Sequence, residues 1–298
     1  MPQVLGCRMN MEEGRSSGRR SLRESLQEYG RGVAGGLLFS VPLLYTMEIW
    51  WAGFRLGPCY LLAYIGTTFL LLLGYNRFAG MRKDASYIEV CIDSIEEMGM
   101  GLLMATLTLF LLGQITAEMP LPEILGKIVV ESMTVAVGIS VGTSQLGAGT
   151  SSDSGLAETQ KSDGHAQTSD TLAQLMLAFC GGMLFAANVG PTDEIETIAV
   201  EAGSFELLGL AALSLLIGAV ILLYSAFVRA EVHTNKDGIF GTILGVVSSY
   251  AVALAAAALL LWFFRGLGDE PPVICISQIV VLAFPAMLGA SAGRLLIQ

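Results

Sequence analysis

Charged side chains are scarce in this 298-residue chain. Only 14% of its residues are Asp, Glu, Lys or Arg, whereas a soluble domain has about 25%. Hydrophobic residues make up 53%, and the mean hydropathy is +0.65. This composition argues against a soluble globular domain and against a disordered chain, which needs low hydrophobicity and high charge. We therefore expect an all-α polytopic membrane protein.

Histidine and cysteine are too few and too scattered for most metal or nucleophile chemistry. The two histidines, His165 and His233, lie in polar connections, so no haem ligand, zinc centre or Ser–His dyad is expected within the membrane. The five cysteines are widely spaced and odd in number, so neither a disulfide framework nor a CxxC metal site can be read from them. We expect no cofactor. Residues 1–31 have no apolar core, so no cleavable signal peptide is expected.

Eight apolar runs predict eight transmembrane helices, because a helix needs about 20 apolar residues to cross a bilayer. Most connections are short, but residues 143–171 are rich in Ser, Thr, Gly and Asp and predict a flexible cytoplasmic linker. The chain then divides into a basic tail (1–31), a first four-span unit (32–142), the linker and a second four-span unit (172–298). The expected spans are 33–54, 57–78, 95–115, 123–142, 172–189, 204–227, 239–264 and 272–293.

The basic residues lie mostly on one side of these spans. Thirteen of the 16 Lys and Arg residues share the side of the N-terminal tail, and only Arg55, Lys127 and Arg265 lie on the other. The positive-inside rule then predicts a plasma or inner membrane protein with both termini in the cytoplasm. The net charge of −10 disfavours a nucleic-acid partner, because phosphate binding needs a basic surface.

Two stretches of the chain repeat. Residues 35–49 match residues 181–195 at seven positions with an offset of 146, and residues 128–142 match residues 279–293 at six positions with an offset of 151. Each half has an even number of expected spans, so both halves start from the cytoplasm. We therefore expect two parallel repeats related by a pseudo-two-fold axis along the membrane normal, with any site at their interface. A duplication that only enlarged a scaffold is the alternative.

A helix break beside carboxylates occurs in both copies of the first repeated stretch. Pro42 is expected to kink its span, and Gly190-Pro191 is expected to break the equivalent one. Broken helices free backbone carbonyls, which together with carboxylates bind hard cations. Glu48 lies 17 residues beyond Arg31, about 25 Å along a helix, in the outer half of the membrane. The candidate cation path consists of Glu48, Thr46, Glu194, Asp193, Thr192 and Asn188.

Glu48 and Glu194 are repeat mates, and they could form an acidic outer mouth or one shared cation site. A plainer interpretation of Glu194 stays open. Pro191 followed by acids is also an ordinary helix N-terminus, so residues 191–201 could be a short interfacial helix outside the bilayer.

Four further acids, Glu89, Asp93, Glu96 and Glu97, are spaced so that they share one stripe of a helix. Like charges at this spacing repel, so such a stripe needs water, protonation or a cation. It would form an inner acidic vestibule that concentrates cations. Ser86 and Glu89 have the spacing of a capping box, which predicts a helix start near residue 86. The alternative is that residues 86–97 project into the cytoplasm.

Glu131 is a single acid within the fourth span, and its repeat mate is Leu282. It is a candidate proton site, or a protonated carboxyl bonded to a neighbouring span. The spacing Gly138, Ser140, Gly142 and its repeat at residues 289–293 is typical of close helix packing.

The stretch Pro42-Leu-Leu-Tyr-Thr46-Met-Glu48-Ile-Trp50-Trp51, with the later Asn188-Val-Gly-Pro191-Thr-Asp-Glu194-Ile, resembles a bacterial family of integral membrane proteins of unknown function. The likeness covers most of residues 30–298. It implies no activity, substrate or site.

The acids at both ends of the spans, with no Lys or Arg in the middle of any span, favour transport of an inorganic cation by a channel or a proton-coupled transporter. One alternative is a structural or sensory membrane protein whose basic tail contacts anionic lipid. An intramembrane hydrolase with a carboxylate dyad is the other. It is disfavoured because the paired residues are Glu, so we do not expect an enzyme. The identity of the ion, the choice between channel and coupled transporter, and homo-oligomerisation stay open.

Overall fold

The structure is a computed structural model that describes residues 22–79, 86–147, 166–230, 238–264, 267 and 270–295. The regular elements among these residues are helices. No strand occurs among these residues. The ten helices are α1 (Leu22–Leu44), α2 (Met47–Arg55), α3 (Pro58–Ala79), α4 (Tyr87–Leu111), α5 (Leu121–Gly147), α6 (Ala166–Ala187), α7 (Asp193–Glu201), α8 (Ser204–Ala230), α9 (Gly238–Phe263) and α10 (Pro272–Leu295). The expected all-helical class is therefore confirmed.

Several expectations fall wholly or partly outside the described residues. They are the tail up to residue 21, residues 148–165 of the linker, both histidines and Arg265. Residues 22–31 of the expected tail form the first part of α1.

Six of the helices, α3, α4, α5, α8, α9 and α10, are long and apolar enough to cross a membrane. Two other long helices are not among these six: α1 is more polar, and the apolar stretch of α6, Thr171–Ala187, is shorter. Apolar side chains are exposed on the outside of α3, α4 and α8. Leu62, Leu103 and Leu208, one from each helix, are at least 67% exposed. A bundle with apolar residues both inside and outside is what a lipid solvent permits.

The expected single span 33–54 is wrong. Helix α1 ends at Leu44, two residues after Pro42, and a separate short helix α2 follows from Met47. Thr46 turns the chain between them: its backbone is extended, and its amide and hydroxyl both donate to the Leu43 carbonyl, at 3.0 and 2.8 Å. Hydropathy does not reveal this turn because the residues on either side are apolar.

The expected break at Gly190-Pro191 is present. Helix α6 ends at Ala187, the Gly190 amide donates to the Ala186 carbonyl at 2.7 Å, and α7 starts at Asp193. The Thr192 hydroxyl donates to the Val189 carbonyl at 2.7 Å. The segment 191–201 is thus mainly a short separate helix, α7, whose Glu196 and Glu201 side chains are exposed.

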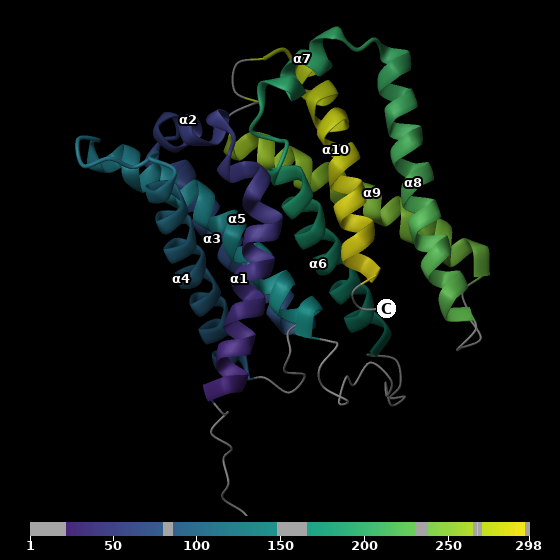
Figure 1. The fold of residues 1–298 in the computed structure, drawn as a ribbon. Helices are drawn as coiled ribbons and strands as arrows, with labels where there is room; N and C mark the ends of the chain where they lie inside the picture. The colour runs from purple at the N-terminus through teal and green to yellow at the C-terminus, as the bar shows by residue number, and fades with distance from the viewer. Residues whose placement is uncertain are drawn as a thin grey trace, which may run out of the picture.

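Helices α5 and α10 hold the centre of the bundle. Helix α1 packs on α5, and α6 packs on α10. A methyl group on Gly35 would overlap the backbone of Gly142, and one on Gly181 would overlap the backbone of Gly289. Both helix pairs therefore meet at backbone contact, as the small residues predict. Figure 1 shows α2 and α7 at one end of the bundle, away from the first residues of α1 and the last residues of α10.

Candidate functional site

A cavity of about 490 Å³ lies at the end of the bundle that carries α2 and α7. Helix α2 supplies one side of its lining. The turn after α6, together with α7, α9 and α10, supplies the rest. The cavity therefore lies between the first half of the chain and the second.

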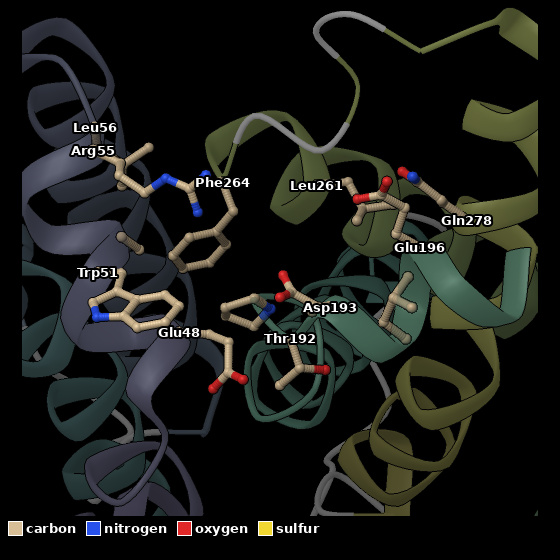
Figure 2. A pocket seen from close by; sticks show the side chains of 14 residues that line it. Glu48, Trp51, Arg55, Leu56, Thr192, Asp193, Glu196, Leu261, Phe264 and Gln278 are labelled. Atoms are coloured by element: carbon tan, nitrogen blue, oxygen red, sulfur yellow. The ribbon is translucent and has the colours of Figure 1, made fainter. Parts of the chain in front are cut away.

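Carboxylates reach this cavity from both halves. Figure 2 shows Glu48 on α2 on one side, with Asp193 and Glu196 on α7 on the other. All three lie in the first turn of their helix, where a carboxylate is also favoured by the helix dipole. Arg55 is the basic residue of the lining, and within the described residues no salt bridge joins it to these carboxylates. Three acids and one base give the lining a formal charge of −2.

Gln278, near the start of α10, adds an oxygen ligand that sequence reasoning missed. Its side chain lines the cavity and is only 1% exposed, and its Oε1 atom has no hydrogen-bond partner among the described residues. In Figure 2 the amide group points from α10 towards the side of the cavity that holds Glu196. A buried acceptor without a partner costs about 1–3 kcal/mol. This atom is therefore suited to bind a water molecule or a cation from the cavity.

The structure brings together some of the predicted cation-path residues and not others. Thr192, Asp193, Gly190 and Pro191 line the cavity together with Glu48. The expected pairing of Glu48 with Glu194 is absent from this lining.

The rotation of α7 about its axis explains this difference. All three acids are exposed, but only Asp193 and Glu196, three residues apart, share the face of α7 that lines the cavity, and Glu194 lies outside that lining. Thr46 serves the turn before α2. Asn188 donates to the Leu184 carbonyl at 2.7 Å, and its Oδ1 atom is buried without a partner among the described residues.

The carboxylates do not form a ready-made chelate. No group of three or more His, Cys, Asp or Glu side chains in the described ranges is close enough to hold a metal ion. The cavity is instead wide and acidic, which suits a cation that keeps part of its hydration shell. Such a lining also raises the local concentration of cations.

The four acids of the expected vestibule differ in their surroundings. Glu89 is exposed and completes the predicted capping box: the Ser86 amide donates to its Oε2 atom at 2.8 Å. Glu96 is also exposed, and Asp93 is half-buried. Only Glu97 belongs to the buried face of α4. The structure thus separates this stripe into surface acids and one interior acid.

Glu97 is held in a polar network between α3, α4 and α5. The Asn76 amide nitrogen donates to Glu97 Oε2 at 2.8 Å and lies 3.1 Å from Ser94 Oγ, while the Ser140 hydroxyl donates to Asn76 Oδ1 at 3.0 Å. Asn76 was missed because a single Asn at the end of an apolar run carries no recognisable pattern.

Glu131 lies in the interior of α5 and is 1% exposed. Neither of its carboxyl oxygens has a hydrogen-bond partner in the described part of the chain. The alternative of a carboxyl bonded to a neighbouring span is therefore not found. One turn further along α5, Thr134 shares a hydrogen bond of 3.1 Å with Tyr64 of α3.

Two basic residues that the sequence placed at the ends of spans are buried. Lys127 is 4% exposed and forms a 2.9 Å ion pair with Glu123. Arg294 is 9% exposed and donates to the Gly245 carbonyl and to the side chains of Gln174, Ser248 and Ser249. Long side chains carry their charge inward along apolar stems, so a position at the end of an apolar run does not imply exposure.

Within the described residues, six helices are long and apolar enough to cross a bilayer, and several of them carry exposed apolar side chains, so the fold is that of a polytopic integral membrane protein. Its two halves enclose an acidic cavity. The family model described as "Putative integral membrane protein (DUF2391)" matches residues 28–297, so the chain belongs to this family, whose function is unknown. No curated protein and no solved structure matches the chain.

Proposed function

We propose that this membrane protein transports an inorganic cation and binds it in the cavity between its two halves. The observation that carries the proposal is the meeting of Glu48, Asp193 and Glu196 in one cavity with the unpartnered, buried amide oxygen of Gln278. Carboxylate and amide oxygens are the ligands that hard cations prefer. The net negative lining disfavours an anion at this position.

A carrier fits the described packing better than an open pore. Away from the cavity, Leu71, Leu72 and Tyr75 of α3 and Leu177 of α6 are at most 4% exposed. Helices α3 and α6 belong to opposite halves and pack on each other. Passage of an ion therefore requires that the halves move relative to each other, as in alternating access.

The proposal includes eight spans in two parallel repeats. Helices α2 and α7 have nine residues each and start at the same place in the repeated stretch. They follow threonines, Thr46 and Thr192, whose hydroxyls donate to the carbonyl three residues earlier. Both halves also contain a backbone-contact helix pair at matching glycines. These similarities support the repeat and favour a site between its copies.

The same proposal places the cavity on the outer face of the inner membrane and both termini in the cytoplasm. The distribution of Lys and Arg supports this orientation. Labelling of single-cysteine variants in intact cells tests it: with the five native cysteines replaced, Glu194→Cys is expected to react with an impermeant maleimide.

A flux screen in proteoliposomes tests the function. Purified full-length protein is assayed with potassium, sodium, calcium and manganese. We expect flux of at least one of them, and we expect the double variant Glu48→Gln with Asp193→Asn to abolish it. The double variant Glu194→Gln with Glu201→Gln is the matched control, because it also removes two negative charges, from positions on α7 that do not line the cavity. Equal flux in the two double variants would refute the site. Absence of flux and of cation-dependent thermal stabilisation for every ion would favour a structural or sensory protein.

A further inference from the structure

Helix α5 carries polar side chains along nearly its whole length. Lys127, Glu131, Thr134, Ser140 and Ser144 all lie on this helix. They span 17 residues, about 25 Å at 1.5 Å per residue. That distance is comparable to the roughly 30 Å hydrocarbon core of a bilayer.

Three of these side chains bond to α3, one of the helices that pack on α5. Thr134 meets Tyr64 of α3 at 3.1 Å, and Ser144 meets Tyr75 of α3 at 2.6 Å. Ser140 donates to Asn76, which in turn donates to Glu97 of α4. A line of hydroxyl, amide and carboxyl groups thus crosses the first half of the protein between α3, α4 and α5. We call this line the α5 polar file.

Glu131 is the member of the file without a partner. An ionised acid in the interior of a bilayer is unfavourable, and so is an unpaired charge inside a protein. The carboxyl of Glu131 is therefore neutral at rest, with a proton that it can release only to a group that reaches it.

Among the described residues, the charged and titratable groups on the surrounding helices leave Glu131 without a counter-ion. Lys127, one turn earlier, is paired with Glu123. Helix α3 contributes Tyr64, whose hydroxyl shares a hydrogen bond with Thr134, one turn further along α5. Helix α4 contributes Glu97, which Asn76 holds, and α2 contributes Glu48 and Arg55 at the cavity.

A small void continues the file beyond Thr134. It has a volume of about 20 Å³ and is lined by Tyr64, Thr68, Thr134, Leu71 and Val137, among others. This volume is sufficient for one water molecule, which needs about 10–15 Å³. The three hydroxyl groups could hold that water. Thr134 and Ser140 are six residues apart, about 9 Å along the helix. A water molecule in the void would lie within this gap between the polar groups of the file.

The second half of the chain keeps only part of such a file. At the offset of 151, Gln278 and Ser291 take the places of Lys127 and Ser140, but Leu282 replaces Glu131 and Pro285 replaces Thr134. A fold that is stable with apolar side chains at these positions does not need the polar ones. The file is therefore a property of the first half that packing alone does not explain.

We propose that Glu131 is an intramembrane proton-binding site and that the α5 polar file carries its proton between the cavity end and the Glu97 end of the first half. A proton enters as the Glu131 carboxylate becomes a carboxyl, and it leaves through the Tyr64 and Thr134 hydroxyls and bound water. The inference rests on the proposed function in one respect: the proton movement is coupled to the cation that the cavity binds.

Infrared spectroscopy of the full-length protein in detergent tests the proton site without any transported ion. We expect a protonated-carboxyl band at neutral pH that loses the Glu131 component in Glu131→Gln, while any component from the other buried acid, Glu97, stays. Glu96→Gln is the matched control, since Glu96 is exposed on α4 and outside the file. The glutamine at position 131 keeps the shape of the side chain, so this variant is expected to fold. A spectrum unchanged by Glu131→Gln would overturn the proposal.

Proton flux into liposomes, reported by an entrapped pH dye under an imposed membrane potential, tests the path. We expect flux in the wild type and in Glu96→Gln, and a fall to the level of protein-free liposomes in both Glu131→Gln and Thr134→Val. Cation flux without proton flux would overturn the relay and leave the proposed cation transport intact. Proton flux without cation flux would support the relay and refute the cation function.

Discussion

Glu131 and Glu97 are both buried in the first half, and replacing each with leucine should change the free energy of unfolding in opposite directions. In Glu131→Leu the substitution removes two oxygens that have no partner and introduces the residue found at the repeat position. The side-chain volumes are similar, so the packing cost is small, under about 1.5 kcal/mol. Relief of an unpartnered buried polar group is worth about 1–3 kcal/mol. We expect this variant to be more stable than the wild type and to lack proton flux.

Glu97→Leu removes the acceptor of the 2.8 Å bond from Asn76 and leaves one of the amide hydrogens of that buried side chain unpaired. The same range, about 1–3 kcal/mol, should then appear as a loss of stability. Equilibrium unfolding of both variants in mixed micelles, with the wild type and Glu96→Leu alongside, measures the two free energies. A Glu131→Leu variant that is less stable than the wild type would refute the reasoning, because it would show that the carboxyl has a bonding partner.

Three further predictions concern packing and the cavity. Gly181→Ala should lower the free energy of unfolding by about 1–3 kcal/mol, because its methyl group would overlap the Gly289 backbone. Gly66 has open space around it, so Gly66→Ala should be neutral or should raise the free energy of unfolding by up to about 1 kcal/mol. Thermal melts of the two variants compare these effects. Gln278→Leu should raise the melting temperature without added ions while it weakens cation-dependent stabilisation; an unchanged ion response would remove Gln278 from the site. Glu123→Gln should cost about 3–5 kcal/mol, because it leaves the buried ammonium of Lys127 without its carboxylate, and the double variant with Lys127→Met should recover part of that loss in the same unfolding assay.

Sequence patterns predicted the elements that depend on local chemistry. Proline and glycine specify the break before α7, and the capping box specifies the start of α4. The choice of Asp193 instead of Glu194 at the cavity depends on how α7 is rotated against α9 and α10, which no offset in the sequence encodes.

The other residues that sequence reasoning missed share one property. Gln278, Asn76 and Arg294 are isolated polar residues within or at the ends of apolar helices. Their importance comes from which helix packs against them. For the same reason the turn at Thr46 was missed, because an apolar run looks continuous even where the chain bends within it.

The glycine contacts between α6 and α10 have a consequence for how the chain is made. Gly181 and Gly289 are 108 residues apart in sequence, and a ribosome adds about 5–20 residues per second. Helix α6 must therefore wait for about 5–20 s before its partner emerges, and α1 waits equally long for α5. During that interval the glycine faces of α1 and α6 lack the helix that covers them in the folded protein, so each half makes its closest helix contact only after its last helix has been synthesised.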